Sequence, residues 1–201
     1  MPLWLAAEPL VLASRSKARR ALLDAAGIPV EIRPADLDER TVAARAGTKP
    51  PAELAVLLAR AKALDVARTT PGRLVLGADQ VLALDGIIFS KPAGRAAARA
   101  QLAALRGKTH VLHSGLAVAR GGDVLFACVA EARLTMRAFS DNFIETYLDT
   151  AGAAVTESVG GYQVEGIGIQ LFERIDGDHS TILGLPLLPL IAFLRRQGCL
   201  A

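Results

Sequence analysis

The chain has 201 residues, 52% of them hydrophobic, and carries a formal net charge of +3 at neutral pH. This length suits a single domain, residues 1–201, that has room for two lobes, and the apolar content excludes a disordered chain. Aromatic residues make up only 4% of the chain and no long basic stripe is present, so no nucleic-acid partner is expected.

Other bulk features predict a protein that stays in the cytoplasm. Cys128 and Cys199 are too far apart for a metal or redox motif, which predicts two reduced thiols. The first eight residues lack a basic start and a long apolar run, so no secretory signal is expected. The most apolar stretch, 182–194, contains two prolines and is shorter than the roughly 20 residues of a membrane span, so no membrane partner is expected.

The predicted elements mix strands and helices along the whole chain. Apolar runs predict strands at 10–13, 28–32, 74–76, 81–84, 87–89, 111–119, 124–133 and 167–175. Helical spacing and caps predict helices at about 17–26, 51–69, 92–106, 140–150 and 187–197. Asp85-Gly86 is a hairpin signal. Hairpins together with crossovers predict an α/β fold with a mixed, twisted sheet flanked by helices.

The helix expected at 51–69 carries an apolar stripe at helical spacing. The stripe consists of Leu54, Leu57, Leu58, Ala61 and Leu64. Lys62 lies at the border of this stripe, so the sequence places an ammonium group beside the predicted core.

The first strand leads directly into a cationic helix start. Ser14 follows the apolar run 10–13, and four cations come within the next six residues: Arg15, Lys17, Arg19 and Arg20. Free N–H groups at a helix N-terminus bind anions, and Ser14 or Ser16 can cap the helix or donate to a phosphate oxygen. The alternative interpretation is a capped surface helix with a solvated basic face.

Asp79 stands out among the acidic residues because it follows an apolar strand and a glycine. A carboxylate at the carboxyl end of a strand can bind a metal or act as a general base, whereas a turn aspartate often only caps neighbouring backbone. The acidic group Asp36, Asp38 and Glu39 suits Mg²⁺ or Mn²⁺, or it is a solvated loop. Lys91, before a helix, can meet a phosphate or be an ordinary surface lysine.

The remaining motifs are weaker. The glycine-rich segment 160–168 permits close backbone approach to a ligand, but it is not a dinucleotide fingerprint, and no Walker A pattern occurs. The three histidines, His110, His113 and His179, lack metal-like partners in the sequence, which favours surface or structural roles.

Taken in order, six segments resemble the Maf family of nucleotide pyrophosphatases. They are Leu12-Ala13-Ser14-Arg15-Ser16-Lys17-Ala18-Arg19, Asp38-Glu39, Lys62-Ala63, Gly77-Ala78-Asp79-Gln80, Lys91-Pro92 and the C-terminal pair Phe172–Gly177 with Gly184–Leu187. Each motif alone is weak, but their order is specific and covers nearly the whole chain.

The resemblance implies a two-lobed fold with a central cleft, similar to that of inosine triphosphatases, and a homodimer. It also implies cleavage of a nucleoside triphosphate between its α and β phosphates. Asp79 would accept a proton from the attacking water, and Glu39 with Asp79 would hold a divalent cation, Mg²⁺ or Mn²⁺. The triphosphate-binding residues would be Ser14, Arg19, Lys62 and Lys91.

The family resemblance also bears on the base. Gln80 and Glu165 match members that act on 7-methyl-GTP, whereas members for dTTP and UTP carry threonine after the aspartate. A carboxylate at Glu165 can accept hydrogen bonds from guanine and offset the positive charge of the methylated ring. Ala18 departs from both subgroups, which carry tryptophan or arginine there, and Lys17 replaces the usual proline. The alternatives are a dTTP/UTP pyrophosphatase and a non-catalytic nucleotide-binding regulator of cell division.

Overall fold

The computed structural model describes residues 3–45 and 47–201, so Met1, Pro2 and Ala46 of the predicted domain lie outside the described residues. The chain divides into two compact units. Unit 1 comprises the residues up to Gln80 together with Ser114–Ala130 and Asp178–Ala201. Unit 2 comprises Val81–His113 and Glu131–Gly177.

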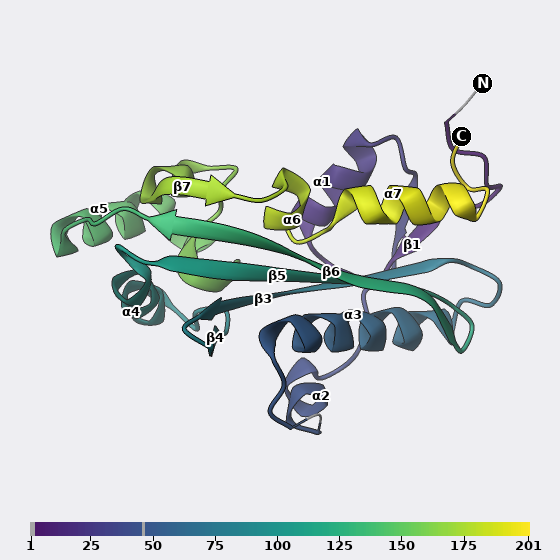
Figure 1. Cartoon of the computed structure of the whole chain (residues 1–201), viewed down its shortest axis with the longest axis horizontal. Coiled ribbons are helices and arrows are strands. Elements are labelled where there is room, and N and C mark those ends of the chain that lie inside the picture. The colour runs from purple at the N-terminus through teal and green to yellow at the C-terminus, as the bar shows by residue number, and fades with distance from the viewer. Residues whose placement is uncertain (1–2, 46) are drawn as a thin grey trace. The chain divides into compact units, whose positions relative to one another are not determined.

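The described strands form one seven-stranded mixed sheet (Figure 1). Its order is β2 (Val30–Ile32), β1 (Leu10–Leu12), β3 (Val75–Leu84), β5 (Thr109–Arg120), β6 (Asp123–Met136) and β7 (Phe172–Asp176), with β4 (Ile87–Phe89) paired to β3. Strand β1 runs parallel to β2 and β3, whereas the β3–β4 and β6–β7 pairs are antiparallel. The predicted α/β fold with a mixed sheet is therefore confirmed.

The helices follow the predicted order with two additions. The expected helices are α1 (Lys17–Ala25), α3 (Pro51–Ala67), α4 (Arg95–Leu105), α5 (Asp141–Ala151) and α7 (Leu187–Arg196). The short helices α2 (Glu39–Arg45) and α6 (His179–Ile182) were not predicted. Asp38 starts α2 by accepting hydrogen bonds from Arg40 N and Thr41 Oγ1, and Asp178 caps α6 in a similar way. Both are short segments held by side-chain caps, which leave little periodic signal.

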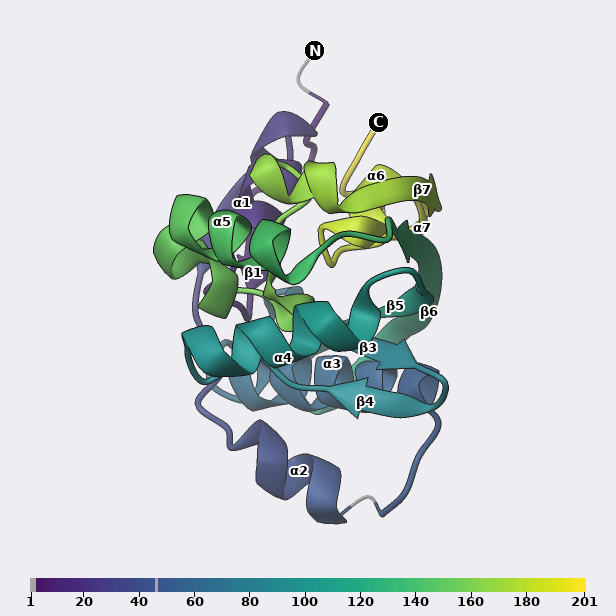
Figure 2. The ribbon, with the colours of Figure 1, turned by 90° about the vertical axis from the view of Figure 1, so that its left-hand side faces the viewer.

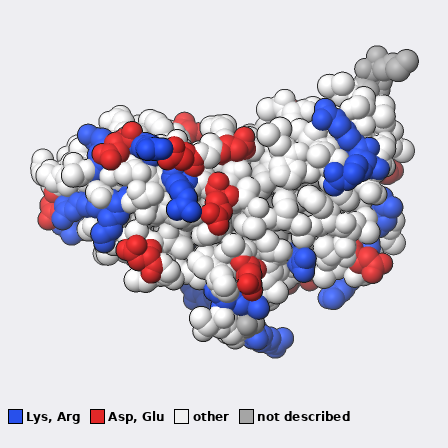
Figure 3. All heavy atoms as spheres, in the orientation of Figure 1, with Lys and Arg blue, Asp and Glu red and all other residues white. Residues whose placement is uncertain are grey.

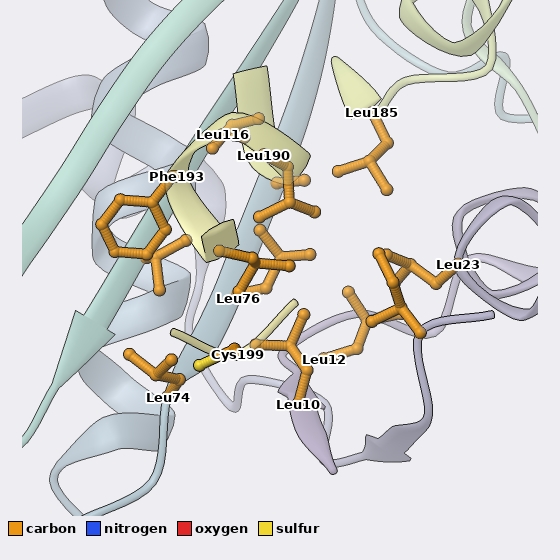
Figure 4. Packing of buried hydrophobic residues seen from close by; sticks show 14 residues of the cluster. Leu10, Leu12, Leu23, Leu74, Leu76, Leu116, Leu185, Leu190, Phe193 and Cys199 are labelled. Carbon is orange, nitrogen blue, oxygen red and sulfur yellow. The ribbon is translucent and has the colours of Figure 1, made fainter. Parts of the chain in front are cut away.

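Strand β1, which lies next to the edge strand β2, has both of its faces buried in unit 1. Leu10 and Leu12 point into a cluster with Leu23 of α1 and Phe193 of α7 (Figure 4). Val11, between them, points to the opposite face, where it packs with residues of α3. Accordingly, α3 lies on one side of this part of the sheet, and α1 and α7 lie on the other (Figure 1).

The face that α3 turns to the sheet differs from the predicted leucine stripe. Its buried residues are Ala55, Leu58, Ala59, Lys62, Ala63, Val66 and Ala67, while four of the five predicted stripe residues are only partly buried. The reason is close packing on glycine. A Cβ on Gly77 would lie 2.2 Å from the Ala59 carbonyl oxygen, and one on Gly115 would lie 2.5 Å from the Ala55 backbone. Only small residues on α3 permit this approach, and Lys62 is thereby carried into the interior.

Helix α2 packs against α3 and lies on the side of α3 that faces away from the sheet in both ribbon views (Figure 1, Figure 2). Glu39 is its first residue, so this short helix determines where that carboxylate lies. No helix among residues 3–45 and 47–201 has the length and apolarity needed to span a bilayer.

Unit 2 is built on α4, which packs against α5 and the 3-10 turn η2 (Val159–Gly161). Ion pairs join the two helices, including Arg99 Nε to Glu145 Oε1 at 2.6 Å and Arg106 to Asp141 at 2.5 Å. In the view of Figure 3, positive and negative side chains are correspondingly interspersed at the α4–α5 end. Exposed pairs of this kind contribute little to the free energy of unfolding.

Two local predictions in unit 2 had different outcomes. The hairpin at Asp85-Gly86 is confirmed, with positive φ at both residues, as a type I′ turn requires. The strand predicted at 167–175 is wrong over its first half, where Ile167–Leu171 forms the 3-10 turn η3. Gly168 sits so close to Gln163 that a Cβ would lie 2.4 Å from the Gln163 carbonyl oxygen. Because these residues form a tight turn, the strand begins only at Phe172.

Candidate active site

The start of α1 presents one hydroxyl group in a defined orientation. Ser16 caps the helix by accepting from Arg19 N at 3.3 Å. Ser14 Oγ accepts two hydrogen bonds, from Ser16 N and from Arg19 Nη1, each at 3.2 Å. Because a hydroxyl oxygen has two lone pairs and one proton, Ser14 retains its O–H as a donor to a ligand.

Arg19 is the buried cation of the N-terminal cluster, while Arg15, Lys17 and Arg20 are exposed. Its Nε donates to the Gly184 carbonyl at 2.8 Å, and its Nη1 donates to the Ala78 carbonyl at 2.7 Å. Three hydrogen bonds to protein therefore hold the guanidinium group beside the middle of β3. The prediction that a strand ends before Asp79 is wrong, because β3 continues through Gly77–Gln80 to Leu84. Within the described part of the chain, Nη2 makes no hydrogen bond and remains for an anion.

Asp79 lies on β3 directly after Ala78 and is 7% exposed. Its Oδ1 accepts from Lys62 Nζ at 2.6 Å, and the same ammonium group lies 2.7 Å from Glu39 Oε1. Strand β3, helix α3 and helix α2 thus each supply one charged group to a single point. Asp79 Oδ2 accepts no hydrogen bond from any described residue, so this oxygen can accept a proton from water.

Burial and charge act in opposite directions on these groups. Burial raises the pKa of Asp79, and the charges of Lys62 and Arg19 oppose the rise. Burial likewise lowers the pKa of Arg19, opposed by the charges of Asp79 and Glu39. Two cations and two carboxylates share this partly dry site. A carboxyl group whose pKa is drawn upward is a better proton acceptor than an exposed one once it is ionised.

Glu39 and Asp79 are the two carboxylates of this site that could hold a divalent cation. No group of three or more His, Cys, Asp or Glu side chains suited to a metal occurs among residues 3–45 and 47–201. However, Glu39 and Asp79 already flank one positive charge, the Lys62 ammonium. Mg²⁺ in phosphoryl-transfer sites is commonly held by one or two carboxylates together with substrate phosphates. These two side chains therefore fit a metal that arrives with a phosphate ligand.

Gln80, the next residue on β3, is held by its amide nitrogen. Nε2 lies 2.9 Å from Ser114 Oγ, 3.2 Å from the Thr181 carbonyl and 3.0 Å from the Ile182 carbonyl. Ser114 Oγ itself donates to Thr181 O at 2.7 Å. The carbonyl acceptors fix the orientation of the amide, so Oε1 is the atom that Gln80 can offer to a ligand, as an acceptor.

The structure thus brings together six of the sequence-predicted site residues in unit 1: Ser14, Arg19, Glu39, Lys62, Asp79 and Gln80. Lys91 and Glu165 belong to unit 2, where Lys91 precedes α4 and Glu165 lies in the turn before η3. Both are exposed. Their roles stay predictions.

Other candidates from the sequence have structural partners. Asp38 caps α2, and Asp36 N donates to Asp65 Oδ2. His110 is fully buried, with Nε2 2.7 Å from Tyr162 Oη, and burial lowers its pKa to about 4. His113 lies 3.1 Å from Glu131, and its pKa is also lowered, chiefly by burial. These contacts favour structural roles for both histidines.

Sequence reasoning did not identify Ser114 or the turn 181–184 as parts of this site. Ser114 sits in an apolar strand, where a serine carries no signal. The turn contributes only backbone carbonyl oxygens, which no side-chain pattern reveals. The sequence signal for this turn was the C-terminal motif Gly184–Leu187, which is part of the family resemblance.

An α/β chain with a buried aspartate in the middle of strand β3, paired with lysine beside a cationic helix start, defines a candidate phosphate-handling protein. The family model described as Maf-like protein matches residues 9–197, and the chain belongs to this family.

Curated relatives match over the whole chain. A protein of Nitrobacter winogradskyi named nucleoside triphosphate pyrophosphatase is 55% identical over 100% of both chains. A protein of Brucella abortus named 7-methyl-GTP pyrophosphatase is 50% identical over 95% of this chain and 97% of its own length. A solved HAM1 protein of Coxiella burnetii is 17% identical with a TM-score of 0.43, covering 64% of this chain and 72% of that one, too weak a likeness to carry an argument.

Proposed function

We propose that this chain hydrolyses a nucleoside triphosphate to the monophosphate and pyrophosphate. The observation that carries the proposal is the buried Asp79, whose Oδ1 is bound by Lys62 at 2.6 Å while Oδ2 has no partner among the described residues. The hydrogen bond from Lys62 fixes the orientation of the carboxylate, so Oδ2 can accept a proton from water without a rotation of the side chain. The family and the names of the curated relatives support the same reaction class, a hydrolase acting on phosphoric anhydride bonds.

The chemistry follows from the groups present. Water attacks the α-phosphorus, the bond from that phosphorus to the bridging oxygen breaks, and pyrophosphate leaves with that oxygen. The proton of the attacking water passes to Oδ2 of Asp79. A divalent cation held by Glu39 and Asp79 would neutralise phosphate oxygens. Ser14 O–H and Arg19 Nη2 then donate to the phosphates, and Lys62 supplies positive charge from the α3 side.

The preferred base rests on two side chains that offer acceptors. Gln80 presents Oε1, because its nitrogen is bound to backbone carbonyls and Ser114. Glu165, an exposed residue of unit 2, is included on the family resemblance alone and would contribute a carboxylate. Acceptors of this kind pair with N–H donors of a guanine edge, and a carboxylate also offsets a methylated, cationic ring. We therefore assign 7-methyl-GTP as the substrate, in line with the name of the Brucella relative.

A pyrophosphate-release assay tests the reaction. Purified protein is incubated with 7-methyl-GTP, GTP, dTTP and UTP, with Mg²⁺ or Mn²⁺ present or chelated. We expect pyrophosphate and monophosphate in equal amounts, only with metal, and fastest from 7-methyl-GTP. Asp79→Asn should abolish the release while far-UV circular dichroism stays unchanged. Normal turnover by this variant would refute the role of Asp79 as the general base.

The same assay separates the alternatives. Faster release from dTTP and UTP than from either guanine nucleotide would assign the chain to the other subgroup. Binding of triphosphates without release, across the whole panel and with metal, would indicate a nucleotide-binding regulator. Glu165→Gln tests the charge argument, since it retains the shape of the side chain and removes only its charge. It should lower the preference for 7-methyl-GTP over GTP, and an unchanged ratio would count against a role in base recognition.

A further inference from the structure

The turn Thr181–Gly184 touches two site residues through its backbone. Arg19 Nε donates to the Gly184 carbonyl at 2.8 Å, and Gln80 Nε2 donates to the carbonyls of Thr181 and Ile182. All of these residues belong to unit 1. Three consecutive contacts from one turn therefore determine which atoms of Arg19 and Gln80 remain for a ligand.

Gly184 ends helix α6 in a recognised way. Gly184 N donates to Thr181 O at 3.0 Å, and Leu185 N donates to Ser180 O at 2.9 Å, the two bonds of a Schellman motif. Its φ of +86° is the left-handed conformation that this motif requires. The Schellman motif alone therefore accounts for a glycine at this position. A test of any further role must control for the loss of this motif.

The space beside Gly184 gives a second reason for a glycine, and the Schellman motif does not require it. A Cβ at this position would lie 3.2 Å from Arg19 Nη2 and 3.4 Å from Arg19 Nε. Nη2 is the nitrogen of Arg19 that makes no hydrogen bond to the described residues. The missing side chain of Gly184 thus leaves space directly beside the one part of the guanidinium group that faces no protein acceptor.

We propose that Gly184 is a positioning residue for Arg19: its carbonyl holds Nε, and its lack of a side chain keeps Nη2 open to a phosphate of the substrate. The inference deepens the proposed function and rests on it. It gives Arg19 a defined task at the triphosphate, with two N–H groups of Nη2 as donors. It also explains how the C-terminal end of α6 contributes to the site through its backbone carbonyl groups.

The chain itself supplies matched controls. Gly198 ends α7 with the same two bonds, Gly198 N to Arg195 O and Cys199 N to Leu194 O, both at 2.9 Å. Its φ is +70°, and an added Cβ would meet nothing within 4 Å. Gly27 ends α1 in the same motif with φ of +68° and equally open space. Alanine at either site adds the strain of a positive φ without approaching Arg19.

The test compares Gly184→Ala with Gly198→Ala and Gly27→Ala. The affinity for inorganic pyrophosphate is measured by calorimetry, and KM and kcat are measured by pyrophosphate release. We expect Gly184→Ala to weaken pyrophosphate binding and raise KM by roughly tenfold or more, the range for one hydrogen bond to a charged group. The two control variants should stay within about twofold of wild type. Equal effects in all three variants would overturn the proposal, since only the shared strain would then matter.

A double-mutant cycle distinguishes action through Arg19 from a general change in the turn. In an Arg19→Lys background Nη2 is absent, so adding Gly184→Ala should no longer weaken pyrophosphate binding. A full additional loss would overturn the proposal. The binding readout also separates this inference from the proposed reaction. If wild type binds pyrophosphate but hydrolyses no nucleotide, the reaction fails while the cycle still decides the role of Gly184. Absence of pyrophosphate binding by wild type would overturn the role itself.

Discussion

Replacement of Lys62 by methionine tests whether its ammonium group is needed to hold the buried Asp79 in its charged form. The two groups are 2.6 Å apart, which corresponds to a gross attraction of about 6 kcal/mol at an effective dielectric constant of about 20. Desolvation offsets part of this attraction, and removing one member of a buried pair costs about 3–5 kcal/mol. At roughly 2–4 °C per kcal/mol for a chain of this size, the melting temperature of Lys62→Met should fall by about 6–20 °C.

The loss should depend on pH. Burial already raises the pKa of Asp79 above its ordinary value of 3.8, and loss of Lys62 removes the main opposing charge. Between pH 3.8 and the raised pKa of Asp79 in the folded variant, the folded chain binds more protons than the unfolded chain, so stability falls as pH rises and stays low above that pKa. Lys62→Met should therefore be closest to wild type in acid and furthest from it above neutrality. Its pH–rate profile should show an acidic limb moved to higher pH.

A second substitution in the same background provides the control. Asp79→Asn removes the uncompensated charge, so the double variant Lys62→Met/Asp79→Asn should be more stable than Lys62→Met alone, although inactive. Thermal unfolding followed by circular dichroism between pH 5 and 9 is measured for wild type, Lys62→Met and the double variant. If the double variant is as unstable as Lys62→Met at every pH, the loss comes from packing of the α3 face, and the electrostatic argument is refuted.

Three further outcomes are expected. Glu39→Gln should raise the metal concentration for half-maximal activity several-fold and shift stability by less than about 1 kcal/mol, because the Glu39 side chain is 52% exposed; an unchanged metal titration would exclude it as a ligand. His110→Gln should flatten the decline in melting temperature between pH 6.5 and 4, since His110 folds neutral with a pKa of about 4; an unaltered slope would contradict this. Gly77→Ala should fail to fold or melt far below wild type, because its Cβ would lie 2.2 Å from the Ala59 carbonyl oxygen, whereas Gly94→Ala, with open space, should not.

The amphipathic and capped parts of the fold could be predicted from the sequence, because their signals are local. Ser140 does cap α5, accepting from Phe143 N at 3.1 Å, and the glycine after α1 does end that helix. The prediction left open whether Ser14 or Ser16 caps α1, and the structure assigns the cap to Ser16. The two serines are only two residues apart and both lie just before the helix, so spacing alone does not decide between them.

The buried face of α3 and the turn 167–171 could not be predicted in the same way. Hydrophobic periodicity favours leucines, but the close approach of β3 and β5 selects alanines on α3. That approach depends on Gly77 and Gly115, which lie in other elements, and no window of α3 contains this information. Likewise, Gly168 packs on Gln163, and an apolar run that contains one glycine cannot be distinguished from a strand until its packing partner is known.

The position of Lys62 connects these packing effects with the chemistry. On an exposed face of α3 this lysine would be one of many solvated cations. The small residues around it let the helix sink onto β3, so its ammonium lies 2.6 Å from Asp79 and 2.7 Å from Glu39. A cation at this point stabilises the ionised carboxylate that a hydrolytic base requires. The same two carboxylates are then spaced for one shared positive charge, whether it comes from lysine or arrives with a substrate. A substitution that enlarged Ala59 or Ala63 would therefore be expected to impair the site through Lys62, although both alanines are fully buried between α3 and the sheet.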